Sequence, residues 1–271
     1  MSDDRITASV YIIACDEEHN LRRALDSVRR FDDIVVVDSG SSDATPDIAR
    51  EYTDRVIHHE WTGYAGQKRF ALGQCRHPWV LNIDADEAVT PELEQEIIGL
   101  MKRGDADGLD IPIVDRFLGR SMHSRPNRRI RFFRRDRGRY DETAVHESIR
   151  IDGKVVAARH PLLHYSLPSI EFRLQKQNRY SSLKAAEKRQ QGRQAGLLKL
   201  LFAMPVSFFK SLLLRGGWRD GTRGFINTMM TSYYAFLKEA KLYELQVNDE
   251  DASRSMGSDS IGSNNQEEKK K

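Results

Sequence analysis

Residues 34–43 read Ile-Val-Val-Val-Asp-Ser-Gly-Ser-Ser-Asp, a run of apolar side chains that ends in a carboxylate and a turn. The apolar residues occupy successive positions instead of alternating ones, so both faces of this strand are predicted to be covered. Pro46 follows the turn and stands where a helix would begin. A strand that is buried on both faces and followed at once by a helix is typical of a parallel sheet.

The same alternation of strand and helix runs through the first 115 residues. Besides 34–38, we predict strands at 8–14, 55–58, 79–84 and 108–114, and helices at 18–29, 66–76 and from Pro91 onward. Elements that alternate at this spacing form a mostly parallel sheet with helices on both faces. The sequence therefore predicts an α/β fold.

Beyond residue 115 the pattern changes, and the chain is predicted to have three parts. Strand-like runs at 130–133, 145–151, 155–158 and 162–165 complete a first domain over 1–166. Residues 167–246 are predicted to form a basic helical extension, with helices at 173–191, 197–214 and 225–245. The stretch 247–271 is polar and lacks periodicity, which predicts a disordered tail.

The net charge of +3 hides an uneven distribution. Residues 1–110 carry a net charge of −11, residues 111–224 one of +16 and residues 225–271 one of −2. This split indicates a metal-holding region beside a surface for phosphate, nucleic acid or anionic lipid. Cys15 and Cys75 are the only cysteines, which excludes a disulfide scaffold and favours a reducing compartment. The start of the chain lacks the pattern of a signal peptide, so we expect a cytoplasmic protein.

The strongest local signal is Asn82-Ile-Asp-Ala-Asp-Glu87, at the end of a predicted buried strand. Ligands of open α/β sheets collect at the carboxyl ends of the strands. Asp84 and Asp86 could there point toward one ion, and oxygen ligands suit Mg²⁺ or Mn²⁺. The alternative is an acidic loop that caps the next helix, since Asp-x-Asp alone is a weak signal.

A second signal is Asp38 with the Gly/Ser turn that follows it. Its carboxylate could bind a ribose or a base edge, and the turn could offer backbone N–H groups to a nucleotide. The chain has neither Gly-x-Gly-x-x-Gly nor a P-loop, so those phosphate-binding loops are excluded. The alternative is an ordinary turn between strand and helix, which accounts for Asp43 but leaves Asp38 unexplained.

The third signal is the segment 141–147, which combines Asp141, Glu142, His146 and Glu147. His146 and Glu147 are adjacent, so on a strand they face opposite ways. Glu147 as a general base competes with a structural ion pair to one of the ten arginines of 116–139. Farther along, His164 is a candidate third metal ligand, although a lone histidine after apolar residues is more often a hydrogen-bonded core residue.

In their order, these segments resemble the family 2 glycosyltransferases, which have the GT-A fold and use a nucleotide-sugar donor. The resemblance rests on segments 14–21, 36–45, 65–70 and 81–87. Asp16 stands where many relatives have Asn. Segments 131–135, 144–147, 164–166 and 217–221 narrow the resemblance to the subgroup that contains the lipopolysaccharide core β-1,4-glucosyltransferases. The similarity covers residues 6 to roughly 245.

The resemblance implies a donor site and a metal site. The donor would be a nucleoside diphosphate sugar, with a UDP-sugar as the leading candidate. The cofactor would be a divalent ion, Mg²⁺ or Mn²⁺. Asp86 would be the direct metal ligand, Asp84 a ribose contact or second ligand, and His164 a further ligand. The nucleoside pocket would be lined by Asp16, Asp38 and Lys68.

The resemblance also implies inversion at the anomeric carbon, which needs a carboxylate general base opposite the leaving group. Glu147 is the predicted base, because relatives place an acid near this point, and Asp141 and Glu142 are the alternatives. The implied acceptor is a glycolipid or polysaccharide of the cell envelope, with transfer of glucose to an inner-core heptose as the nearest match.

The segment 197–214 is apolar but contains Lys199, Pro205 and Lys210, which argues against a membrane span. The two lysines fall within roughly 20° of each other on a helix, an arrangement that suits a helix lying in the membrane interface. A core helix packed on the first domain is the alternative. A lipid-linked acceptor favours peripheral attachment to the inner face of the cytoplasmic membrane.

Three other functions are less well supported. A haloacid-dehalogenase-type phosphatase also has Asp-x-Asp after a strand, but there the motif follows the first strand. A basic module that binds nucleic acid or anionic lipid without transferase activity would use the arginines of 116–139, yet no RNA-binding motif is present. An inactive scaffold is not supported, because all the expected acidic positions are occupied. We therefore predict a transferase with no nucleic-acid partner.

Overall fold

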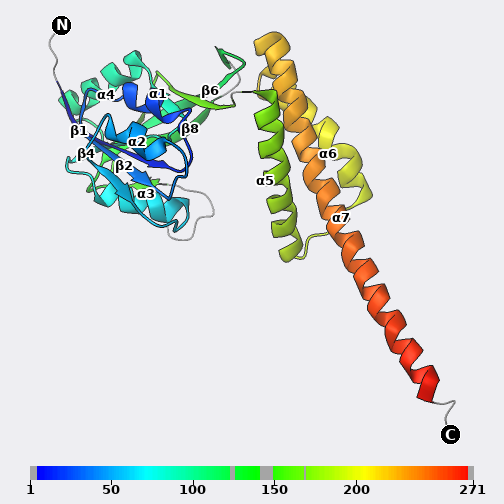
Figure 1. Ribbon diagram of the computed structural model, residues 1–271. Helices are drawn as coiled ribbons and strands as arrows, with labels where there is room; N and C mark the ends of the chain where they lie inside the picture. The colour runs from blue at the N-terminus through cyan, green and yellow to red at the C-terminus, as the bar shows by residue number, and fades with distance from the viewer. Residues whose placement is uncertain (1–4, 123–125, 141–148, 168, 268–271) are drawn as a thin grey trace. The chain divides into compact units, whose positions relative to one another are not determined.

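The computed structural model describes residues 5–122, 126–140, 149–167 and 169–267. The chain divides into two compact units, Met1–Met122 with Pro126–Ser166, and Leu167–Lys271 with His123–Arg125. The first unit holds the sheet and the second is helical (Figure 1).

The main sheet of the first unit has the strand order β3-β2-β1-β4-β8-β6-β12-β5. Its first four strands are parallel: β1 (Ile6–Ala14), β2 (Phe31–Asp38), β3 (Val56–His58) and β4 (Trp79–Asn82). The remaining four are β5 (Glu87–Val89), β6 (Gly108–Phe117), β8 (Asn127–Arg134) and β12 (Leu162–Leu167). Strand β8 runs antiparallel to both of its neighbours. The predicted α/β class is confirmed, and the antiparallel strand is a feature that the sequence pattern did not predict.

The smaller strands extend this sheet or form a separate ribbon. Two of them, β7 (Arg120–Ser121) and β11 (Val155–Ala157), pair with β6. The other two, β9 (Gly138–Tyr140) and β10 (Ile149–Ile151), form a two-stranded antiparallel sheet.

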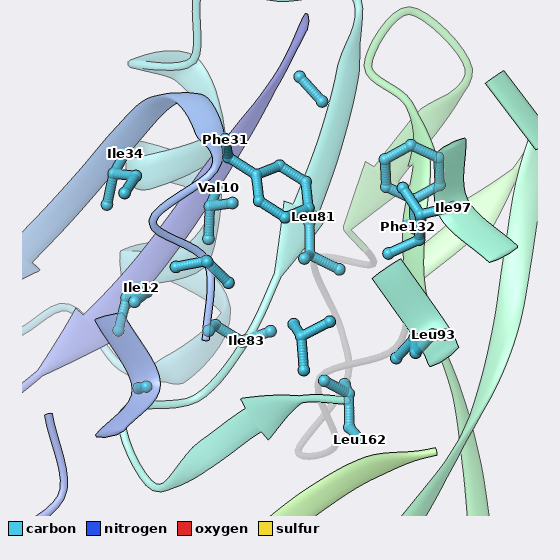
Figure 2. Close-up of a cluster of buried hydrophobic side chains, with 14 of the residues drawn as sticks. Val10, Ile12, Phe31, Ile34, Leu81, Ile83, Leu93, Ile97, Phe132 and Leu162 are labelled. Carbon is cyan, nitrogen blue, oxygen red and sulfur yellow. The ribbon is translucent and has the colours of Figure 1, made fainter. Parts of the chain in front are cut away.

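Both faces of the parallel strands are buried, as the unbroken apolar runs predict. Val10 and Ile12 of β1 point into one cluster, whereas Tyr11 and Ile13 point into the other. The first cluster is covered by α1 (Leu21–Asp26), α2 (Thr45–Arg50) and α4 (Pro91–Arg103), and Figure 2 shows its side chains. The second is covered by α3 (Tyr64–Gly73). This alternation fixes the strand register, because a shift by one residue would exchange the two faces.

A buried carboxylate at the start of β2 ties three parts of the first unit together. Asp33 accepts hydrogen bonds from Ser9 Oγ at 2.5 Å, from the Arg76 N–H at 2.9 Å and from Arg55. Burial alone would raise the pKa of Asp33, but these donors outweigh it and hold the pKa below its ordinary value. Asp33 therefore stabilises the fold in its ionised form.

Replacing Asp33 with Asn should lower the free energy of unfolding at pH 7 by about 1–3 kcal/mol, because the charged partner of Arg55 is lost. The folded pKa lies below the unfolded one. The stabilisation is therefore complete above the unfolded-state pKa of about 3.9 and is lost as the pH falls through the folded value. Urea unfolding of the parent protein and of Asp33→Asn should show that the difference in their free energies of unfolding becomes smaller as the pH is lowered. Asp47→Asn is the control, because Asp47 is 79% exposed in its pair with Arg50; an equal loss there would contradict the prediction.

The second unit is built from helices that pack along α7 (Gly221–Glu267). Helix α5 (Ile170–Gln190) and helix α6 (Leu197–Phe209) both lie along it (Figure 1). A π-helical turn (Lys210–Leu214) continues α6, and a short 3₁₀ helix (Gly217–Asp220) precedes α7. From α5, Arg173 donates hydrogen bonds to Asn227 and Thr231 of α7. One segment, Leu197–Leu214, is by length and composition sufficient to cross a membrane: its mean hydropathy is 1.8 over 18 residues, of which 6% are buried.

The end of the chain differs from the sequence-based expectation. A disordered tail was predicted over 247–271, but α7 continues through Glu267. Packing against α5 and α6 has already formed the preceding turns, and extending an existing helix requires no new nucleation.

Candidate functional site

The carboxyl ends of the parallel strands meet at one edge of the sheet. The register pairs Ala14 with Asp38 and Tyr11 with Asn82, so the loops after β1, β2 and β4 leave the sheet side by side. This edge is where open α/β sheets bind ligands. It carries Asp16, Asp38 and the segment 82–87.

Asp38 and Asp16 organise the loop after β2. Asp38 is 6% exposed and accepts hydrogen bonds from the N–H groups of Gly40 at 3.0 Å and Ser41 at 3.1 Å. Asp16 has a φ of 54° and accepts from the N–H of Ser42 at 2.7 Å. The predicted nucleotide-binding amides of this turn are thus bound to the protein's own carboxylates. Both aspartates lie at the predicted site, where they shape the loop.

Helix α3 links this loop to the loop after β4. Gln67 is fully buried and donates to Ser39 Oγ at 2.7 Å and to the His59 carbonyl at 2.8 Å. The next residue, Lys68, is 4% exposed, and its Nζ lies 2.8 Å from Asp84 Oδ1. One helical turn of α3 therefore fixes the positions of both loops.

Asp84, whose side chain is 34% exposed, is neutralised by two cations. Its Oδ2 accepts a hydrogen bond from Arg131 of β8 at 2.6 Å, and its Oδ1 faces Lys68. Arg131 also binds Asn82 Oδ1 at 2.7 Å and Glu87 Oε1 at 2.8 Å. Both Asp84 oxygens thus have cationic partners. The ribose contact or second metal ligand that the resemblance implies for Asp84 stays a prediction.

The electrostatics of this cluster follow from burial and from its two cations. Burial raises the pKa of Asp84, but Arg131 and Lys68 outweigh it and hold that pKa well below the ordinary value. Glu87 is 2% exposed; burial and the neighbouring Asp84 charge raise its pKa to about 7 against the opposing effect of Arg131. The cluster is a structural support beneath the site, and Arg131 is its central cation.

Asp86 lies beside this cluster and has a different environment. Its Oδ2 lies 3.2 Å from His164 Nε2, and His164 Nδ1 lies 2.7 Å from Asp115 Oδ1 of β6. The antiparallel register of β5 and β12 places His164 opposite Glu87, which brings it next to Asp86. The side chains of Asp86 and His164 are 16% and 27% exposed, so solutes can reach them.

His164 between two carboxylates forms an arrangement that attracts a cation. Burial lowers the pKa of His164, but the hydrogen bonds to Asp115 and Asp86 outweigh it and raise the pKa to about 10. A carboxylate that holds the far nitrogen of a ligating histidine is the usual support of a protein metal site. Asp86 offers a divalent ion an oxygen ligand, and His164 would ligate the ion once the ion displaces the Nε2 proton that this raised pKa keeps bound at neutral pH.

Over the described ranges, no group of three or more His, Cys, Asp or Glu side chains is arranged to hold a metal. Mg²⁺ is often held by one or two carboxylates together with substrate phosphates, and Asp86 supplies one such carboxylate.

Cationic groups also flank the ring of Tyr165, the residue after His164. Arg23 of α1 lies with Cζ 4.0 Å from the ring centroid, and Arg116 of β6 donates to Tyr165 Oη at 3.2 Å. The N–H of Tyr165 donates to the Asp86 carbonyl at 2.8 Å. Two guanidinium groups thus hold the side chain of Tyr165, which follows His164 on β12 and therefore faces the other side of that strand.

The remaining predicted residues have different outcomes. Glu147, Asp141 and Glu142, the predicted base and its alternatives, lie outside the described residues. Several arginines of 116–139 serve the fold, since Arg128 pairs with Asp110 and Arg135 binds the Cys75 carbonyl.

Sequence reasoning assigned no role to Asp115 or to Arg131. A charged residue between Ile130 and Phe132 in an apolar strand was a signal for Arg131. Asp115 had no comparable signal, because about 50 residues separate it from His164.

Comparisons with known proteins identify the family of this chain. The model of the family described as Glycosyl transferase family 2 matches residues 9–155. The lipopolysaccharide core biosynthesis glycosyltransferase LpsC of Rhizobium meliloti (strain 1021) is 37% identical over 251 residues, covering 89% of this chain and 93% of LpsC. An uncharacterized glycosyltransferase of Rickettsia typhi is 32% identical over 255 residues, covering 88% of this chain and 87% of that protein.

Solved structures show weaker similarity. The crystal structure of residues 1–349 of S. aureus TarS in complex with UDP-GlcNAc aligns with a TM-score of 0.45 and 15% identity, covering 88% of this chain and 89% of that TarS fragment. The family match spans more than half of the chain, and LpsC is similar over nearly its full length. On these two findings, this chain belongs to glycosyl transferase family 2 and is a glycosyltransferase.

Proposed function

We propose that this protein transfers a sugar from a UDP-sugar to a glycan acceptor of the lipopolysaccharide core, with inversion at the anomeric carbon. The observation that carries the proposal is the partly exposed pair of Asp86 and His164 at the carboxyl edge of the sheet. The acceptor class is supported by LpsC, the 37% identical relative, which is a lipopolysaccharide core biosynthesis glycosyltransferase. Glucose added to an inner-core heptose is the specific reaction that we propose.

The divalent ion, Mg²⁺ or Mn²⁺, would be held by Asp86 and His164. When bound, it would supply Lewis-acid stabilisation of the charge that develops on the diphosphate leaving group. Asp115 orients His164 through Nδ1 at 2.7 Å and so presents Nε2 to the site. Arg23 and Arg116 provide further positive charge beside Tyr165.

The nucleoside would be bound at the loop that Asp16 and Asp38 hold. Lys68 and Asp84 neutralise each other, so in this proposal their contribution is to fix the floor of the site. A rigid floor keeps the donor in one orientation relative to the metal ligands, and such positioning is a major part of catalysis in group transfer.

The acceptor hydroxyl must lose a proton, and Glu147 is the proposed base, with Asp141 and Glu142 as alternatives. Glu147→Gln should keep the affinity for UDP and lower turnover by about a hundredfold, because the amide cannot accept the proton. Steady-state rates and UDP binding measured on the same preparation check this. Glu142→Gln is the matched control and should keep most of the turnover. A near-normal rate in Glu147→Gln would remove that residue from the role.

Thermal denaturation in the presence of UDP, GDP, ADP or CMP, each with Mn²⁺, Mg²⁺ or EDTA, tests the donor assignment. We expect stabilisation by UDP alone, and only with a metal, because ligands that bind the native state raise the unfolding temperature. A shift with ADP instead would indicate a heptose-type donor. No shift with any nucleotide would contradict the proposed function.

We also propose that the protein works on the cytoplasmic side of the inner membrane as a peripheral protein. A lipid-linked acceptor requires access to the membrane surface, and α6 with its continuation carries the apolar segment suited to it. No nucleic-acid partner is proposed.

A further inference from the structure

Helix α6 presents an apolar face that the second unit does not cover. None of its residues is buried, and Leu198, Phe202 and Phe209 are 71%, 56% and 59% exposed. At about 100° per residue these three side chains fall within roughly 40° of one another, so they form one stripe along the helix. Contiguous exposed apolar surface of this kind marks an interaction site.

A cationic groove borders this stripe. It has a volume of about 630 Å³ and lies between α6 and α7. The cations that line it are Lys199, Lys210, Arg215 and Lys238, against a single acid, Glu239. Glu239 is in turn bound to Lys188 of α5. The groove is thus positive along a helix whose other exposed side is apolar.

The cations from the α6 side are not used by the fold. Within the part of the chain that the structure describes, Lys199, Lys210 and Arg215 form no ion pair with a carboxylate. Lys238 lies over the Tyr234 ring at 4.7 Å, and burial together with Lys188 and Lys184 lowers its pKa. Positive charges gathered without compensating carboxylates favour an anionic ligand.

We propose that this groove binds the phosphate headgroup of an anionic phospholipid while the apolar stripe of α6 enters the outer part of the bilayer. The inference deepens the proposed membrane attachment and rests on it. Each half of the lipid has a complementary surface on the protein. The cations of the groove would bind the phosphate, and Leu198, Phe202 and Phe209 would contact the start of the acyl chains. Trp218, which is 60% exposed shortly after this segment, suits the same interfacial depth.

The geometry argues against the two other occupants of this face. A span through the bilayer would place Lys199 and Lys210 in hydrocarbon, where a charged side chain is costly. A second copy of this chain would bring the same cations together and would leave them unneutralised. A lipid surface satisfies both the apolar stripe and the charge.

The test is sedimentation of the full chain with vesicles of phosphatidylcholine alone or mixed with phosphatidylglycerol. We expect the protein to bind only the mixed vesicles and to be released by high salt. Each lysine near an anionic surface strengthens binding by about fivefold, so Lys199→Gln with Lys210→Gln should weaken partitioning by roughly thirtyfold. The control exchanges two exposed lysines of the first unit, Lys102→Gln with Lys154→Gln, and should partition within about twofold of the parent protein.

Several outcomes would overturn this assignment. Equal binding to both kinds of vesicle, or an equal loss in the control, would exclude a headgroup site in the groove. Retention in the membrane after an alkaline carbonate wash would indicate a spanning segment. Self-association would be indicated if the measured mass of the protein doubled as its concentration rose and if added vesicles did not prevent this doubling.

Two measurements separate this inference from the transferase proposal. The double lysine variant should keep its circular dichroism spectrum and its metal-dependent stabilisation by UDP. Conversely, Asp86→Asn should bind the mixed vesicles as the parent protein does. Failure of the groove and failure of the transferase site are therefore distinguishable.

Discussion

Asp86→Asn is expected to lower turnover at least about a thousandfold while the protein remains folded. The amide would still approach His164 but would bind a divalent ion poorly. The stabilisation that a metal gives to a developing charge amounts to several kcal/mol, which corresponds to this loss of rate. The variant should unfold at the parent temperature without ligand, and UDP with Mn²⁺ should no longer stabilise it.

The variant Asp115→Asn tests whether Asp115 acts by positioning the metal ligand His164, without itself binding the metal. Asp115 touches only the far side of His164, at 2.7 Å from Nδ1, so the ligand itself remains. We expect metal affinity to fall by about 10–100-fold and turnover to recover at saturating Mn²⁺, a pattern that a purely structural role would not produce. Full activity of Asp86→Asn at ordinary metal concentration would exclude the proposed metal site.

The first half of the fold could be predicted from the sequence because each element carries its own periodic signal. The run at 34–38 lies within β2 (Phe31–Asp38), and the predicted strand at 79–84 contains β4 (Trp79–Asn82). Thr90 caps α4, since its Oγ1 accepts the Leu93 N–H at 3.2 Å. Helix α1 begins only at Leu21 and not at residue 18.

The site could be predicted only where its residues adjoin a strand end. Asp38, Asp84 and Asp86 follow strands with clear patterns, so their common edge could be predicted from the parallel order. Their individual roles could not, because partners distant in sequence set them: Arg131 neutralises Asp84, and His164 joins Asp86 to Asp115. These partners lie on the antiparallel strand β8 and on β6 and β12. No local sequence pattern predicts which strands these three pair with.

Arg131→Met is expected to be the most destabilising single change in the first unit. Arg131 is 7% exposed and binds Asp84, Glu87 and Asn82 at once. Methionine fills much of the space but leaves the buried carboxylates without their shared cation. Breaking a buried ion pair on one side costs about 3–5 kcal/mol, which corresponds to a fall of about 10 °C in unfolding temperature for a unit of this size. Calorimetry of the full chain measures it.

Arg129→Met on the same strand is the matched control, because Arg129 is exposed and, among the residues that the structure describes, its side chain donates only to the carbonyl of Arg128. A comparable loss there would show that the strand, and not the charge cluster, is sensitive. The charge argument also predicts a partial rescue. With Arg131 already replaced, Glu87→Gln removes one of the uncompensated buried carboxylates and should recover part of the lost stability, whereas a loss due to packing would not respond. Recovery would establish that Arg131 stabilises the fold chiefly by neutralising the carboxylates beneath the metal site.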